Sequence, residues 1–266
     1  MSHAHDSAPP GLRMHSALFF LALSTTGACA PITSAQPETT AATDEGAVVG
    51  TTLADSERPE VVALDVEKGG RTFVCTGTVV GAHTVLTARH CLDGAMDDLG
   101  CHVTVIVDRK GESALGPSVG RYPAAGCVVM GTGSSFRTDL ALLRLETAVA
   151  GVVPARLATR ATPRGTYTVY GYGSFGRGLG VSCESPSDGH KRKALYAGSL
   201  GFRFGQVTCK GDSGGPHFAG TSNVIAGVTS GGASSLGVAV DMNVDVRDTR
   251  EWIVEVMRTF GDVADP

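Results

Sequence analysis

The sequence has no long hydrophobic run, few aromatic residues and little excess of either charge. Its longest apolar stretch, Ala17–Leu23, is too short to cross a bilayer as a helix. Aromatic residues make up 6% of the 266 positions, and the formal net charge is only −4. These shortages argue against a bundle of membrane-spanning helices and against a nucleic-acid or other polyanionic partner.

Glycine and cysteine, in contrast, are abundant. The 36 glycines, together with many Val and Thr runs, favour short strands and tight turns, so we expect an all-β fold. Six of the 7 cysteines lie in the body of the chain, and an even number after an export signal indicates three disulfides in an oxidising compartment. The alternative of a zinc site is disfavoured because no C-x-x-C pair occurs.

The first 47 residues have the composition of processing segments. The apolar run Ala17–Leu23 followed by small residues predicts an export signal over residues 1–29. Its end, Thr26-Gly27-Ala28-Cys29, is similar to a bacterial lipobox, so Cys29 is a candidate for lipidation, with ordinary signal cleavage as the alternative. Residues 30–47, rich in Ala, Thr and Pro, are interpreted as a flexible tether or propeptide.

From Val48 onward, short β-rich runs alternate with turn residues, which predicts a sandwich or barrels and no βαβ units. The one credible helix covers residues 246–260, where Trp252, Ile253 and Val256 share a face. The predicted strands are 60–66, 71–80, 84–88, 102–107, 127–130, 140–145, 166–170, 193–196, 216–218, 224–230 and 237–244.

One motif points to a different function. Residues 171–176 fit G-x-G-x-x-G, the dinucleotide fingerprint. A helix must follow that fingerprint, and residues 177–189 are too rich in Gly, Ser and Pro to form one. Nucleotide binding is therefore disfavoured.

The strongest chemical signal is the stretch Cys209–Pro216, which reads CKGDSGGP. Glycines around Ser213 favour a tight open turn, where a hydroxyl projects and neighbouring backbone N–H groups converge. A nucleophile with an oxyanion hole needs this arrangement, whereas an ordinary surface turn is the alternative interpretation.

A nucleophilic serine needs a base and an orienting acid. His90 is the best base, because it follows a strand-like run and precedes Cys91, whose disulfide would fix the backbone. Asp139 begins the apolar run Asp139–Leu145 and is the best acid. The remaining histidines of the body are interpreted as surface or loop residues: His83, His102, His190 and His217.

Three stretches, LTARHC at 86–91, TDLALL at 138–143 and CKGDSGGP at 209–216, together resemble the His, Asp and Ser motifs of the chymotrypsin/trypsin family of serine endopeptidases. They occur in that family's order, and the resemblance covers about residues 48–260. It implies two antiparallel six-stranded β-barrels, about 48–155 and 156–245, and a C-terminal helix, about 246–260, within a domain of 48–266. The lipobox-like signal suggests a bacterial secreted or lipoprotein form.

The resemblance also implies roles for single residues. His90 would take the proton of Ser213 during attack on a peptide bond, with Asp139 orienting the imidazole. The amides of Gly211 and Ser213 would bind the oxyanion, and no cofactor or metal would be needed. The segment that would pair with a polypeptide substrate is Ser230-Gly231-Gly232. We expect a monomer that touches a membrane only through a lipid at Cys29.

The resemblance further implies a zymogen. Val48-Val49-Gly50-Thr51 is similar to the family's mature N-terminus, whose new amino group would pair with Asp212. A buried carboxylate is costly unless paired, so the nucleophile turn should form poorly before cleavage after Ala47. The alternative is that Val48 merely begins the first strand. The protein would be secreted or attached to the cell envelope.

By the same resemblance, Val207 lies at the base of the primary specificity site, where it offers a substrate cation no partner. Gly232 and Gly237 would form walls that leave room for a large side chain. We therefore expect an uncharged, mainly apolar residue before the scissile bond. Asp241 is the alternative, as a displaced acid that reaches the same site.

Three disulfides complete the resemblance. Cys75–Cys91 corresponds to a bridge of the family, and Cys101–Cys127 and Cys183–Cys209 follow from nearness in the expected barrels. Two departures from the family's pattern are Arg89, where a small residue is usual, and the missing cysteine after Gly232, which leaves Cys209 to another partner. Two other functions remain open: a catalytically inactive relative that binds proteins, and a non-enzymatic envelope lipoprotein.

Overall fold

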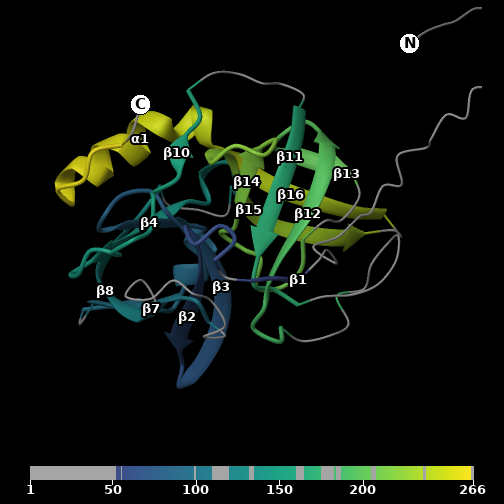
Figure 1. The fold of residues 1–266 in the computed structure, drawn as a ribbon. Helices are drawn as coiled ribbons and strands as arrows, with labels where there is room; N and C mark the ends of the chain where they lie inside the picture. The colour runs from purple at the N-terminus through teal and green to yellow at the C-terminus, as the bar shows by residue number, and fades with distance from the viewer. Residues whose placement is uncertain are drawn as a thin grey trace, which may run out of the picture. The chain divides into compact units, whose positions relative to one another are not determined.

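The computed structural model shows a mostly β protein with a single long helix near its C-terminus among the described residues (Figure 1). The residues described are 52–54, 56–98, 100–109, 120–131, 135–159, 165–174, 183, 187–204, 208–235 and 238–264. Cys29, Val48, Val207 and Gly237 lie outside them.

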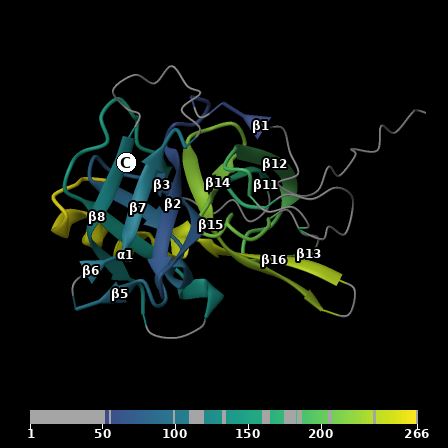
Figure 2. The same cartoon turned by 90° about the horizontal axis from the view of Figure 1, so that it is seen from below.

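The first half of the chain forms a closed antiparallel barrel with the strand order β2-β3-β4-β9-β8-β7, seen from below in Figure 2. Its strands are β2 (Val61–Lys68), β3 (Arg71–Val79), β4 (Thr84–Thr87), β7 (Val103–Val107), β8 (Gly120–Val129) and β9 (Ala141–Leu145). Beside them lie η1 (Arg89–Leu92), η3 (Phe136–Thr138) and a small two-stranded sheet of β5 (Met96–Asp97) and β6 (Gly100–Cys101). The six-stranded barrel expected from the sequence is confirmed for this half.

Strand β2 is buried on both faces along most of its length, which explains its nearly continuous apolar sequence. On β2, Val62, Leu64 and Val66 point to the barrel interior. The intervening Val61 and Ala63 belong to a second cluster, shared with the other sheet and with helix α1 (Val246–Thr259). Since strand side chains alternate between faces, one strand serves two cores.

The second half forms an eight-stranded sheet rather than the closed six-stranded barrel that we expected. The strand order is β1-β12-β11-β14-β15-β16-β13, with β10 added beside β15. Its strands are β1 (Thr52–Leu53), β10 (Arg156–Leu157), β11 (Gly165–Gly171), β12 (Lys191–Gly198), β13 (Phe202–Phe204), β14 (Pro216–Ala219), β15 (Val224–Ser235) and β16 (Val238–Asp245).

Among the described residues, no pairing joins the two edge strands, β1 and β13, to close this sheet. Part of the free edge of β12 is taken by β1, through Thr52↔Arg192 and Leu53↔Lys191. After β12 the chain turns and β13 pairs with β16 instead. The β1 pairing also corrects the expected boundary, since these first residues join the second sheet and not the first barrel.

Helix α1 begins and ends close to the expected residues. The Asp245 side chain caps its N-terminus by accepting from the Arg247 amide, and Ile253 and Met257 bury its apolar face. Just beyond the helix, buried Asp262 accepts hydrogen bonds from the His83 amide at 2.8 Å and from the Thr84 hydroxyl at 2.7 Å. The C-terminus is thereby anchored to β4, the strand that leads to His90.

Candidate active site

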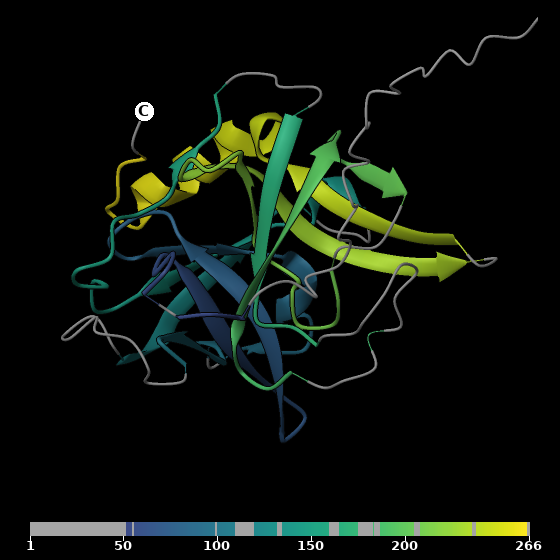
Figure 3. The ribbon, with the colours of Figure 1, turned by 45° about the vertical axis from the view of Figure 1, so that its right-hand side comes forward.

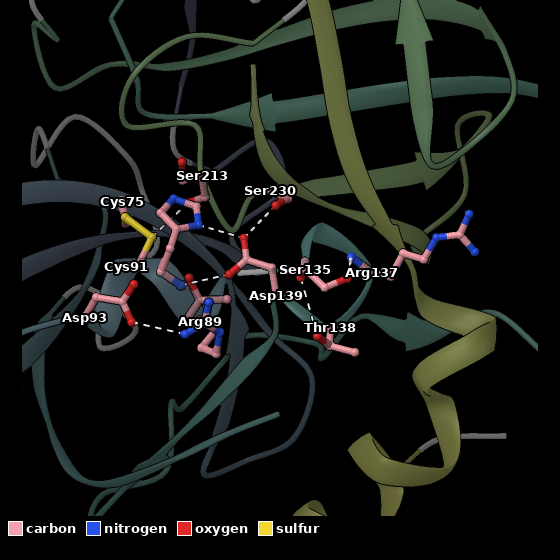
Figure 4. Close-up of polar contacts among 12 residues, drawn as sticks. Cys75, Arg89, Cys91, Asp93, Ser135, Arg137, Thr138, Asp139, Ser213 and Ser230 are labelled. Carbon is pink, nitrogen blue, oxygen red and sulfur yellow. Dashed lines mark hydrogen bonds and ion pairs between the residues drawn. A yellow bond between two sulfur atoms is a disulfide. The ribbon is translucent and has the colours of Figure 1, made fainter. Parts of the chain in front are cut away.

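His90 and Asp139 are brought together by two paired strands. β4 and β9 are antiparallel neighbours, with Thr87 opposite Ala141. His90 follows β4 in η1, and Asp139 lies between η3 and β9. Asp139 accepts a hydrogen bond from the His90 backbone N–H at 2.8 Å, and its other oxygen lies 2.7 Å from His90 Nδ1 (Figure 4). With Nδ1 bonded to the carboxylate, the tautomer that donates there leaves a lone pair on Nε2, as a general base requires.

A third residue, Ser230 on β15, completes this group. Its hydroxyl donates a 2.6 Å hydrogen bond to Asp139 Oδ2. Ser230 lies where a register shift interrupts the pairing of β15 with β16. Burial by itself would raise the pKa of Asp139, but the bonds from His90 and Ser230 outweigh it and hold this pKa below its ordinary value of 3.8. The Asp139 carboxylate is therefore ionised at neutral pH and stabilises positive charge on the imidazole.

Ser213 lies on a turn that only glycine allows to sit so close to β4. Gly214 has φ +83°, and a Cβ there would lie 2.1 Å from Thr87 Oγ1 and 2.3 Å from the Thr76 carbonyl oxygen. The Ser213 carbonyl accepts from the Thr76 amide at 2.9 Å, and the Gly214 amide donates to the Thr229 carbonyl at 2.8 Å. These bonds join the nucleophile turn to β3 and β15, next to the strand that precedes His90.

The backbone amides of this turn fall into two groups. The Asp212 amide donates to the Cys209 carbonyl at 3.0 Å, and the Gly215 amide to the Asp212 carbonyl at 2.9 Å. Within the described part of the chain, the amides of Gly211 and Ser213 donate to no protein group. Thr76 Oγ1 donates to the Gly211 carbonyl at 2.8 Å and so helps to fix that peptide. The two amides without an internal acceptor are those that an oxyanion would need.

Ser213 and the His90 ring are not hydrogen-bonded to each other in the described residues. Such bonds are often long without substrate and shorten on binding. The backbone around them is held by the Cys75–Cys91 disulfide, whose Cα atoms lie 6.3 Å apart, and by a 3.7 Å contact from Cys91 Sγ to the Ser213 carbonyl (Figure 4).

All three expected disulfides are present. Cys101–Cys127 joins β6 to β8 in the first half, and Cys183–Cys209 ties the segment before Ser213 to residue 183. Cys209 thus has the substitute partner that the missing cysteine after Gly232 required.

Asp212 is a fully buried acid directly before Ser213. Its carboxylate accepts from the Gly173 amide at 2.8 Å and from the Cys209 amide at 2.7 Å. Burial raises its pKa to about 7 despite these two bonds. A Cβ at Gly171 or Gly173 would lie within 2.7 Å of Asp212, so these glycines make room for the acid. The first two glycines of the G-x-G-x-x-G pattern are therefore explained by the packing of Asp212, and no bound nucleotide is needed to explain them.

Two other sequence-based interpretations are resolved by the geometry. Arg89, the large residue before His90, pairs with Asp93 at 3.3 Å. His217 is not on the surface as predicted: it lies buried on β14, between the Tyr196 hydroxyl at 2.8 Å and the Thr229 hydroxyl at 3.0 Å. The sequence predicts the strand at 216–218, which the structure has as β14 (Pro216–Ala219), but not that the His217 side chain would be buried.

The family model named Trypsin matches residues 47–253. The chain belongs to the trypsin family. Curated relatives of this family include serine protease SP24D of Anopheles gambiae, 29% identical over 235 residues, which cover 80% of this chain and 82% of that protein. Serine protease 56 of Mus musculus is also 29% identical, over 83% of this chain but only 40% of its own length. Relatives from an insect and a mouse give no support to a bacterial origin.

Solved structures show the trypsin-family fold. The scabies mite inactivated protease paralogue S-I1 matches with a TM-score of 0.59 and 18% identity, covering 79% of this chain and 99% of that one. Mouse neuropsin, a serine protease expressed in the limbic system of the brain, matches with a TM-score of 0.57 and 22% identity, covering 78% and 98%. Because one of these two is described as inactivated, the fold alone does not establish catalysis.

The positions that the sequence predicts to bind substrate are described only in part. Ser230, Gly231 and Gly232 lie on β15 (Val224–Ser235) beside the catalytic group, and a Cβ at Gly231 would meet nothing within 4 Å. In the described ranges, no group of three or more metal-binding side chains occurs, and no helix has the length and apolarity to cross a membrane.

Proposed function

We propose that the protein is an active serine endopeptidase that hydrolyses polypeptides through an acyl-enzyme. The observation that carries the proposal is the chain of hydrogen bonds from Ser230 through Asp139 to His90. The turn around Ser213 adds two backbone amides, of Gly211 and Ser213, that donate to no protein group in the described residues. A complete set of Ser, His and Asp supports catalysis here. The comparisons offer no support for the alternative of an inactive binding lipoprotein.

The proposed reaction begins when His90 Nε2 accepts the Ser213 hydroxyl proton as Oγ attacks the scissile carbonyl carbon. The resulting oxyanion accepts hydrogen bonds from the Gly211 and Ser213 amides. Asp139 keeps the imidazole oriented and balances its positive charge. His90 then protonates the leaving amine, and a water activated by the same imidazole hydrolyses the acyl-enzyme to regenerate Ser213.

We propose further that the enzyme is exported and made as a zymogen. The three disulfides support an oxidising compartment. Buried Asp212, with its raised pKa, supports a role for a new amino group at Val48 as its counter-charge. Cleavage after Ala47 would also release the enzyme from a lipid at Cys29. Lipid attachment and a monomeric state stay predictions.

In this proposal, the side chain preferred before the scissile bond depends on the residues that would line the specificity site near Ser230–Gly232. Uncharged Val207 favours an uncharged, mainly apolar side chain. Val207 and Gly237 lie outside the described residues, so this preference stays a prediction.

Digestion of a peptide library by the form that begins at Val48 tests the function. The wild type should cleave internal peptide bonds, and Ser213→Ala or His90→Ala should reduce turnover by about a millionfold because triad members act as one unit. Ser222→Ala, which alters an exposed turn serine, is the matched control and should keep full activity. A Ser213→Ala protein that retains more than about a tenth of wild-type activity would disprove the assignment, since triad loss removes far more.

A further inference from the structure

A buried histidine on β14 takes no part in the steps of the proposed reaction. His217 is only 1% exposed, and it lies opposite Val169 of β11, which in turn lies opposite Ala194 of β12. Side chains of directly opposed residues share one face of a sheet, so the imidazole belongs to the face that carries the apolar cluster around Tyr167 and Tyr196. A polar ring in such surroundings is unfavourable unless hydrogen bonds compensate it.

Both ring nitrogens of His217 meet a hydroxyl. The Tyr196 hydroxyl lies 2.8 Å from Nδ1, and the Thr229 hydroxyl lies 3.0 Å from Nε2. A neutral imidazole has one donor and one acceptor, and a hydroxyl can serve as either, so both bonds can exist together. The Tyr196 ring also stands edge-on to the imidazole, at 81° and with the ring centroids 5.6 Å apart. These contacts fix the orientation of the imidazole and, with it, the Thr229 side chain.

Thr229 is the residue of β15 that holds the turn around Ser213. Its amide donates to the Gly215 carbonyl at 2.9 Å, and its carbonyl accepts from the Gly214 amide at 2.8 Å. Both backbone groups of this buried residue therefore bond to the turn, while its hydroxyl meets His217. A displacement of Thr229 would move the turn that carries Ser213.

The next residue joins β15 to the rest of the candidate active site. Ser230 donates to Asp139 at 2.6 Å, and Asp139 in turn lies 2.7 Å from His90 Nδ1. Strands β15 and β16 run side by side as a long hairpin (Figure 3), and their pairing shifts directly after Thr229. Regular ladder pairing is interrupted at such a shift, so side-chain contacts help to fix the backbone there. The contact between His217 and Thr229 lies at the edge of this shift.

We propose that His217 is a positioning residue for the reaction. Through Thr229, its imidazole sets the spacing between the Ser213 turn and the Asp139 carboxylate. The imidazole touches no substrate and transfers no proton. It acts through β15, because one residue of that strand holds the turn and the next one holds Asp139. The proposal rests on the proposed function, since only an active enzyme has reacting groups to position.

Removal of one hydroxyl tests the contact, with a peptide that has Leu before the scissile bond as substrate. Thr229→Val keeps the shape of the side chain and removes the group that meets Nε2. We expect it to lower kcat by about tenfold or more and to change KM by less than about twofold, because a small misplacement of reacting groups slows the chemical step. Thr229→Ser restores a hydroxyl and should keep kcat within about threefold of wild type. Titration of Ser213 with a fluorophosphonate counts the active sites, so that unfolded protein does not enter kcat.

Thr168→Val is the matched control. Thr168 is a buried threonine on β11 of the same sheet, and its hydroxyl donates to the Gly220 carbonyl at 2.7 Å. This variant also removes a buried hydroxyl, but one that bonds to no residue of the candidate active site, so kcat should stay unchanged. An equal fall of kcat in Thr168→Val and Thr229→Val would overturn the proposal, since loss of any buried hydroxyl in the sheet would then explain it.

Two substitutions of His217 itself separate positioning from packing. A Gln amide reaches about as far from the backbone as Nε2, and an Asn amide about as far as Nδ1, so Gln retains a group for Thr229 and Asn a group for Tyr196. His217→Gln should therefore keep a kcat at least about fivefold above that of His217→Asn. Equal kcat values in these two variants would overturn the role of the Nε2 contact.

The rate of fluorophosphonate labelling separates this proposal from the proposed function. Thr229→Val should react with the label more slowly than wild type, by about the factor that its kcat falls. A wild type that reacts, beside a Thr229→Val protein that reacts as fast and has the same kcat, would overturn the role of His217 alone. Folded wild type that neither takes up the label nor cleaves the peptide would overturn the proposed function instead.

Discussion

The burial of Asp212 predicts that removing residues 30–47 changes how stability depends on pH. In the chain before cleavage, the Asp212 pKa is raised from its ordinary value of 3.8 to about 7. The folded state therefore binds the Asp212 proton more tightly than the unfolded state does. Protonation of Asp212 stabilises the fold fully below pH 3.8, and this stabilisation is lost as pH rises through about 7. A shift of this size corresponds to about 4 kcal/mol of unfolding free energy.

Cleavage after Ala47 should cancel this loss. A new amino group at Val48 that pairs with Asp212 favours the ionised carboxylate, so the mature form should not lose stability over the same pH window. The unfolding free energy of the mature form minus that of the longer form should therefore increase by about 4 kcal/mol between pH 4 and pH 8.

Urea unfolding of two proteins, residues 30–266 and residues 48–266 with Val48 as a free N-terminus, measures this difference. Both should carry Ser213→Ala, so that neither digests itself during the experiment. Asp212→Asn in each form is the matched control, since without the titrating acid the two stability curves should run parallel. Parallel curves in the proteins that retain Asp212 would refute the pairing of Val48 with this carboxylate.

Three other variants test single contacts. Ser230→Ala removes a donor to the charged Asp139 and should lower kcat/KM by about tenfold to a hundredfold, and an unchanged value would show that this bond plays no part in catalysis. Replacing both Cys75 and Cys91 by Ser opens a loop of sequence separation 16 and should lower the unfolding free energy by about 3 kcal/mol, with equal stability of the two proteins counting against the disulfide. Asp262→Ala leaves the His83 amide and the Thr84 hydroxyl without their acceptor and should cost about 1–3 kcal/mol in urea unfolding, whereas a loss under about 0.5 kcal/mol would mean that the C-terminal anchor is dispensable.

The parts of the site that rest on local sequence were predictable. Glycines around Ser213 specify its turn, and the strand-like runs beside His90 and Asp139 place both residues at strand ends. The three disulfides expected from the resemblance are also present. Helix α1 was predictable from its apolar face.

Pairings between distant segments were not predictable. The edge position of β1 and the pairing of β13 with β16 depend on which backbone groups meet after folding, and no residue pattern encodes that choice. The position of Asp241 opposite Gly232 depends on the register shift at Ser230, which moves every later pair of the hairpin. The burial of His217 likewise depends on Tyr196 and Thr229, which come from two other strands.

The most direct test of the central claim is covalent labelling of Ser213 by a fluorophosphonate, followed by peptide mapping of the modified residue. The account predicts one adduct, on Ser213, that is absent in Ser213→Ala and forms far more slowly in His90→Ala, because the imidazole must accept the hydroxyl proton. Labelling that persists in Ser213→Ala, or folded wild-type protein from residue 48 onward that takes up no label, would contradict it.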